Sequence, residues 1–444
     1  MTTNPWPLAV SGRGEGPGFR LLAHVLSPIH ATIRFAPLIF LGTLLIFLFR
    51  PPDVGFYELD RWGFALLVAA CVARALVLRK PLWPSGPMIR PMALLSLLAV
   101  LSTLGQPYDS QTWSLLAAKF AVPYTLYYLA GLTFDTPAWL RRLEILLLFV
   151  LAYLSLTAIF QLLGWDFLVF PRYILNPELG IHVDRARGPF LQAVANGVTL
   201  NLLGLVALSG VCRGRIRGTV AVLLLSALPI AILATMTRAV WLSFAGSMAW
   251  LGLSQRGILR KASIALIALA LLGLLFTLAT PQSESTLLDR AEEQSPIDFR
   301  MAVYHSALEM AAEKPMFGWG VNRMPPEIAR RVEGYSAVAY AAHNSFLEIL
   351  VENGVVGLAL YLSIAVGLFR LAWRKDGNPA WGRTLAGEEF RHLWPVLVCV
   401  YWFNACFVVM NYQFVNALFF TLAGVLAASR PAAARRRDAI AGSY

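Results

Sequence analysis

Repeated apolar runs, each close to the length of a membrane-crossing helix, constrain this chain more than any other feature. Such a helix needs about 20 mostly apolar residues, because the hydrocarbon core is about 30 Å thick. Backbone polar groups in lipid must pair internally, so a chain of such runs folds as an all-α integral membrane protein. We expect a single polytopic domain over residues 1–444. About twelve spans are predicted, at residues 35–49, 62–78, 91–106, 113–133, 143–163, 191–211, 218–236, 239–254, 262–280, 346–369, 393–411 and 414–429.

The positions of the cations orient these spans. The chain is 58% hydrophobic, and its net charge of +12 is compatible with a nucleic-acid partner, anionic lipid or simple topology. Short cytoplasmic loops retain Lys and Arg, and alternate loops here are basic. Both termini are therefore predicted to be cytoplasmic, no cleaved signal peptide is indicated, and no nucleic-acid partner is expected. These cations are Arg79, Lys80, Arg90, Arg141, Arg142, Arg213, Arg215, Arg217, Arg256, Arg260, Lys261, Arg374, Lys375, Arg383 and Arg435 to Arg437.

Two segments on the opposite, non-cytoplasmic side are long enough to hold a site: residues 164–190 and the large loop 281–342 between spans nine and ten. Part of the large loop has apolar residues at helical spacing and predicts an amphipathic helix near the membrane surface. Chemistry on the far side of the membrane is expected in these two segments. The apolar residues of the predicted helix are Phe299, Val303, Ala307, Met310 and Ala311.

Several cations and one imidazole are predicted on this same face. Arg300 lies on the amphipathic helix, and Arg238 stands in a very short turn between spans seven and eight. Arg187, with Arg185 beside it, precedes span six, and His343 opens span ten. Each taken alone also fits an ordinary role, as a snorkelling cation or a helix-end residue. Together they predict a site: arginines bind phosphate oxygens in pairs, and a histidine accepts a proton from an attacking hydroxyl.

Other candidates are fewer. Lys119 is a cation within span four, which favours either a substrate contact or pairing with a helix carbonyl or a polar neighbour. Four acids of the large loop form no metal-binding pattern, and no Walker A, GxSxG or HExxH motif occurs. We expect no metal, no nucleotide and no cofactor. The four acids are Asp289, Glu292, Glu293 and Asp298.

The stretch HNSFLEILVENGVVG resembles the histidine motif of the O-antigen ligase and polymerase superfamily. It begins with His343 and Asn344 and contains Gly354 and Gly357. Three further features resemble this family: the turn from Thr235 to Arg238, the Arg-Gly-Pro-Phe segment that starts at Arg187, and the large loop with Arg300 and PMFGWG.

This resemblance implies a GT-C-like glycosyltransferase of the bacterial inner membrane. Such a ligase moves a glycan from undecaprenyl pyrophosphate to a sugar of lipid A–core on the periplasmic face. By the resemblance, Arg187, Arg238 and Arg300 would bind the pyrophosphate, and His343 would orient or deprotonate the acceptor hydroxyl. Asn344 would fix the histidine or cap span ten. With a pyrophosphate leaving group stabilised by fixed arginines, we predict a single inverting displacement.

Three alternatives stay open at this point. A polymerase would join two lipid-linked repeat units, and residue spacing does not separate it from a ligase. A protein O-oligosaccharyltransferase is disfavoured, because the chain ends soon after the last span with no periplasmic domain to recruit protein. A lipid or anion transporter would place charges near mid-membrane, where Lys119 is the main feature in its favour.

Overall fold

The fold is all-α, as predicted. The computed structural model describes residues 35–50, 58–80, 88–180, 182–278, 295–332, 343–373 and 381–428, and no β-strand occurs within these ranges. The predicted tails at both termini, and residues 281–294 and 333–342 of the large loop, lie outside the described residues.

Each of the twelve apolar segments coincides with a helix or helical unit. The first six are Phe35–Leu48, α2 (Leu59–Val77), α3 (Ile89–Leu104), the continuous unit of α4 (Ser110–Leu116), η1 (Ala117–Ala121) and α5 (Val122–Thr133), α6 (Pro137–Leu162) and α7 (Ala193–Cys212). The last six are α8 (Gly218–Ala234), α9 (Arg238–Ser254), α10 (Gly257–Leu278), α14 (Ser345–Arg370), α15 (Glu388–Ala405) and α16 (Gln413–Ala428).

Five of these helical segments are long and apolar enough, by length and composition, to cross a membrane. Four shorter apolar helices accompany them: Phe35–Leu48, α3, α8 and α16. The described chain is therefore that of a multi-pass membrane protein, while the full count of twelve crossings and their orientation stay predictions. The five are Ser110–Thr133, Pro137–Leu162, Ala193–Cys212, Gly257–Leu275 and Ser345–Trp373.

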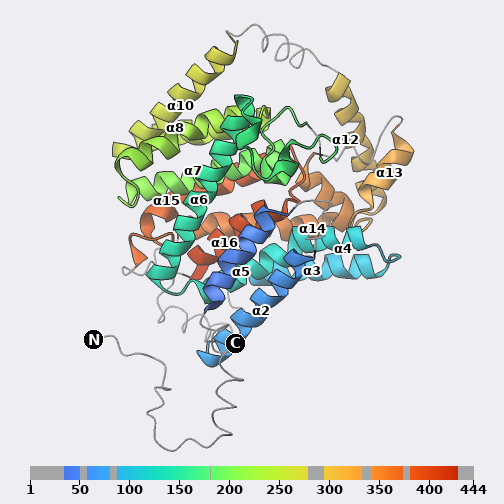
Figure 1. The fold of residues 1–444 in the computed structure, drawn as a ribbon. Helices are drawn as coiled ribbons and strands as arrows, with labels where there is room; N and C mark the ends of the chain where they lie inside the picture. The colour runs from blue at the N-terminus through green and yellow to red at the C-terminus, as the bar shows by residue number, and fades with distance from the viewer. Residues whose placement is uncertain are drawn as a thin grey trace, which may run out of the picture.

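Close helix contacts form the centre of the bundle (Figure 1). Helix α7 is buried along most of its length and touches α6, α8, α9, α10, α15 and α16. Helices α5 and α16 pack closely because Gly424 lets the backbones approach: a Cβ there would lie 2.1 Å from the carbonyl oxygen of Tyr127. Rings of Tyr401 and Phe419 stack at 4.1 Å beside this contact.

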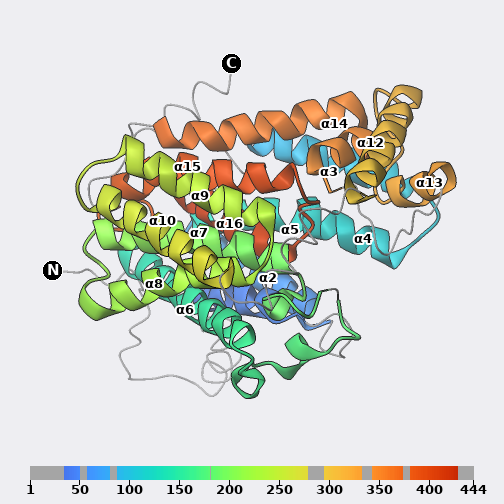
Figure 2. The same ribbon diagram turned by 90° about the horizontal axis from the view of Figure 1, so that it is seen from above.

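Two helices of the predicted large loop are described. Helix α12 (Ser295–Glu313) is the amphipathic helix predicted from sequence, and α13 (Met324–Arg331) follows it. Both lie at one end of the bundle, the right-hand end in Figure 2, together with the segment that joins α6 to α7. The predicted apolar face of α12 is buried through Val303, Ala307 and Met310, which pack against Leu347 and Val351 of α14. The side chain of Phe299 lies outside the described residues.

Helix α14 is two helical pieces joined at Gly354, whose backbone is non-helical (φ 67°, ψ −171°). The segment Pro315–Gly320 fills the break. On one side of it, the N–H groups of Val355 and Val356 donate to the carbonyls of Pro315 (2.7 Å) and Met316 (3.3 Å). On the other side, the N–H groups of Trp319 and Gly320 donate to carbonyls of α14, at 2.9 and 2.8 Å. The break therefore leaves these amides paired.

Cations that the sequence assigned to topology also form ion pairs. The guanidinium of Arg213 donates to both carboxylate oxygens of Glu144, at 2.6 and 3.2 Å, and this pair is buried. Lys80 contacts the carboxylate of Asp135, which Arg74 of α2 also contacts. These pairs join segments at the predicted cytoplasmic end of the bundle.

Candidate functional site

The start of α14 places His343 and Asn344. The Asn344 side chain accepts hydrogen bonds from the backbone N–H groups of Phe346 (3.0 Å) and Leu347 (3.1 Å), so it caps the helix. His343, partly buried, precedes this cap with φ of 49°. Ser345 anchors the same end, because its hydroxyl donates to the Val408 carbonyl at 2.9 Å.

Helix α12 brings Arg300 to His343. Burial lowers the pKa of the His343 imidazole below its ordinary 6.5, and the positive charge of Arg300 lowers this pKa further. The side chain of Arg300 is exposed, and it precedes Val303 and Ala307, the residues by which α12 packs on α14. A buried imidazole beside a cation is neutral near pH 7, which is the form that accepts a proton.

Arg238 is the first residue of α9 and is exposed. Only Thr235, Met236 and Thr237 separate α8 from α9, and the turn is held by the Thr235 and Thr237 hydroxyls, which donate to the carbonyls of Ile232 and Thr235. A cation at a helix N-terminus lies at the positive end of the helix dipole, so an anion there is favoured by both charges.

Arg187 differs from Arg238 and Arg300, because its side chain is fully buried, with 0% exposed. Its guanidinium donates to the carbonyls of Ile174 (2.8 Å), Asn176 (2.5 Å) and Leu179 (2.5 Å). Burial lowers the pKa of Arg187, although an arginine stays charged. In this conformation Arg187 faces carbonyls of its own loop and organises that loop.

The Arg187 loop adjoins the Arg238 turn. The Ala186 N–H donates to the carbonyl of Ala234 at 3.0 Å, which joins the loop to the last residue of α8. Arg185, partly buried, lies next to this contact. The ring of Phe190 packs on the ring of Phe414, with 5.7 Å between the centroids. Four residues before Phe414, the N–H of Met410 donates to the Ser345 hydroxyl at the start of α14. The two groups of predicted residues therefore lie around one end of the bundle.

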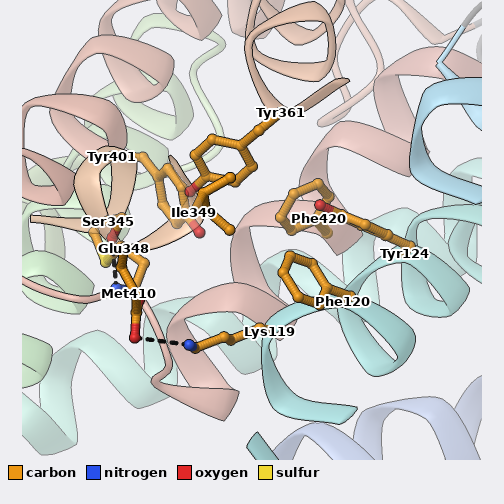
Figure 3. A pocket seen from close by; sticks show the side chains of 10 residues that line it. All are labelled: Lys119, Phe120, Tyr124, Ser345, Glu348, Ile349, Tyr361, Tyr401, Met410 and Phe420. Carbon is orange, nitrogen blue, oxygen red and sulfur yellow. Dashed lines mark hydrogen bonds and ion pairs between the residues drawn. The ribbon is translucent and has the colours of Figure 1, made fainter. Parts of the chain in front are cut away.

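Lys119 is paired with carboxylates. Its ammonium donates to Glu348 (2.8 Å) and Glu352 (3.1 Å) of α14. It lies on η1, a π-helical turn within the predicted fourth span, and π-turns recur at functional sites. Figure 3 shows the Lys119–Glu348 contact beside a pocket that is otherwise lined mainly by Tyr124, Tyr361 and other aromatic side chains.

The sequence analysis did not identify Glu348 and Glu352 as partners of Lys119. A signal was present: two carboxylates one helical turn apart in a predicted span are costly in lipid unless a cation faces them. Within the described residues no group of three or more His, Cys, Asp or Glu side chains is placed to hold a metal ion.

Fold and site together define a multi-pass helical membrane protein with exposed arginines and an imidazole at one end of its bundle. Residues 220–362 match the family model described as O-antigen ligase, which confirms the resemblance to that superfamily over this segment. No curated protein sequence matches the chain. The matched segment contains Arg238, Arg300, His343 and Asn344, whereas Arg185, Arg187 and Lys119 lie outside it. The family indicates ligase- or polymerase-type activity on lipid-linked glycans.

Proposed function

We propose that the protein is an O-antigen ligase of the bacterial inner membrane. It transfers a glycan from undecaprenyl pyrophosphate to a sugar of lipid A–core on the periplasmic face. The observation that carries this proposal is that helix α12 places the charge of Arg300 near the His343 imidazole at the start of α14, inside the segment that matches the O-antigen ligase family. A cation for the leaving group and a base for the acceptor are the two requirements of this transfer.

Arg238 and Arg300 bind the pyrophosphate in this proposal. Both are exposed, and each carries a guanidinium that pairs with two phosphate oxygens at once. Negative charge develops on the leaving phosphate as the bond from the sugar to oxygen breaks, and fixed cations stabilise that charge without reorganising. The N-terminus of α9 adds its dipole at Arg238. These groups supply the charge for which other enzymes use a metal ion.

His343 acts on the acceptor. The acceptor hydroxyl oxygen attacks the anomeric carbon while the bond from that carbon to the pyrophosphate oxygen breaks. The hydroxyl proton passes to the neutral imidazole, and undecaprenyl pyrophosphate leaves. This single displacement inverts the anomeric centre, so a trapped covalent glycosyl-enzyme would contradict it.

The remaining predicted residues have supporting roles in this proposal. Asn344 holds His343 by capping α14. Arg185 contacts the donor from the edge of the loop, next to the Arg238 turn. Arg187 shapes that loop through its three carbonyl contacts, and we assign it to positioning in place of the direct pyrophosphate contact predicted from sequence.

The test is transfer by purified protein, given lipid-pyrophosphate glycan and lipid A–core, with EDTA and without nucleotide. We expect His343→Ala and Arg238→Gln each to lower transfer by about 10²-fold or more. Two exposed residues, His305 and Arg330, supply matched controls as His305→Ala and Arg330→Gln. Chain growth from lipid-linked glycan alone, without transfer to lipid A–core, would show a polymerase in place of the proposed ligase.

A further inference from the structure

A buried charge cluster between η1 and α14 has no part in the proposed transfer. Lys119 is 8% exposed and Glu352 is 0% exposed, and Glu348 completes the cluster. The two carboxylates lie one helical turn apart and face the same ammonium. A lysine so neutralised offers little charge to a pyrophosphate. The cluster therefore calls for a role other than substrate binding.

Glu352 joins three segments of the chain. One carboxylate oxygen contacts Lys119, and the other accepts the backbone N–H of Asn322 at 2.7 Å. The Asn322 side chain in turn donates to the hydroxyl of Thr112 in α4 at 3.0 Å. The predicted fourth span, the segment after Gly320 and the first half of α14 thus form a closed set of contacts.

This set of contacts encloses the break in α14. Segment Pro315–Gly320, which fills the break with four backbone hydrogen bonds, lies between α12 and Asn322. Arg300 is on α12, and His343 immediately precedes the capped start of α14. Any shift of that segment along α14 therefore changes the position of Arg300 relative to His343.

The geometry points to Lys119, Glu348 and Glu352 as positioning residues, which we propose hold His343 in place relative to Arg300. Buried charges are costly to separate. The ion pairs therefore favour one position of α14 along the α4–η1–α5 unit and along segment Pro315–Gly320. This inference rests on the proposed function and replaces the substrate contact expected for Lys119 with an indirect role.

The test compares the wild type with a triple variant, Lys119→Met with Glu348→Gln and Glu352→Gln. Removing all three charges together leaves no unpaired buried charge, so folding is retained. We expect kcat for glycan transfer to fall about tenfold or more, since small misplacements of reacting groups are costly, while the KM for the donor changes by less than about twofold. Glu313→Gln, which breaks a more exposed ion pair with Arg331, is the matched control.

A second measurement does not depend on activity. Amide hydrogen exchange over residues 343–357 is compared in the same proteins, and we expect faster exchange in the triple variant, because the Val355 and Val356 amides lose their fixed partners. A raised donor KM with unchanged kcat and unchanged exchange would make Lys119 a substrate ligand and overturn the inference. If the wild type transfers no glycan, the proposed function fails. Faster exchange in the triple variant would still support the role of the cluster in holding α14 against the loop segment. Unchanged exchange would overturn that role.

Discussion

At the scale of single residues, the imidazole of His343 makes the proposed chemistry dependent on pH. Its pKa lies below 6.5 because of burial and the charge of Arg300. Since the neutral form accepts the proton, kcat/KM should rise with pH and level off above a midpoint that is lower than 6.5. Arg300→Gln removes the cation and should move this midpoint upward, toward 6.5, besides slowing transfer.

The pH profile of kcat/KM across the acidic and neutral range measures this shift. Arg330→Gln removes an exposed arginine on α13 and should leave the midpoint unchanged. An identical midpoint in the Arg300→Gln variant and the wild type would show that a group other than His343 causes the fall of kcat/KM at low pH.

Arg238 and Arg187 should respond differently to the same substitution. Arg238→Gln removes an exposed side chain, so folding should persist while transfer falls by about 10²-fold. Arg187→Gln removes the buried guanidinium that holds three loop carbonyls and should cost about 3 kcal/mol or more of stability. Thermal unfolding in detergent, measured beside transfer, separates these outcomes. A stable but inactive Arg187→Gln protein would return Arg187 to the binding site.

These residues show how far a sequence defines a site. The topology and the histidine motif predicted His343, Arg238 and Arg300 on one face, because span ends can be located from hydropathy and loop charge. The carbonyl partners of Arg187 come from an irregular loop that has no periodic pattern. Glu348 lies 229 positions from Lys119 along the chain, so their pairing depends on tertiary packing.

At the scale of elements, the break in α14 predicts strong sensitivity at Gly354. Its positive φ with an extended ψ suits glycine almost alone, and a Cβ would lie 2.3 Å from the backbone of Met316. Gly354→Ala should therefore destabilise the protein by about 2 kcal/mol or more. Gly246→Ala in α9 is the control, because a Cβ at Gly246 would meet no atom within 4 Å. Thermal unfolding of both variants tests this; equal unfolding temperatures would contradict the requirement for glycine.

The positions of the helices could be predicted from the sequence, but the break inside α14 could not. Every predicted span coincides with a helix, since apolar length alone marks such segments. Side-chain caps at Asp109, Thr136 and Asn344 fix three of the helix starts. The sequence analysis treated Gly354 only as part of a motif, because the hydrogen bonds that allow the break come from a segment more than thirty residues earlier.

At the scale of the whole molecule, the bundle has two chemically different ends. The Arg213–Glu144 pair lies at one end, while Arg238, Arg300 and His343 lie around the other. A periplasmic site requires this second end to face outward, which agrees with the basic loops predicted to be cytoplasmic. The proposed function therefore requires one orientation of the chain in the membrane, and this orientation can be tested.

Two exposed histidines at opposite ends of the bundle allow each side of the membrane to be tested by labelling. His305 lies on α12 and His392 on α15, with side chains 78% and 66% exposed. In a protein whose four cysteines are replaced by serine, His305→Cys should react with a membrane-impermeant thiol reagent in intact spheroplasts. His392→Cys should react only after the membrane is permeabilised. Both should react equally in detergent, which controls for access. Labelling of His392→Cys in intact spheroplasts would show the opposite orientation. Arg300 and His343 would then lie on the cytoplasmic side, which contradicts transfer to lipid A–core on the periplasmic face.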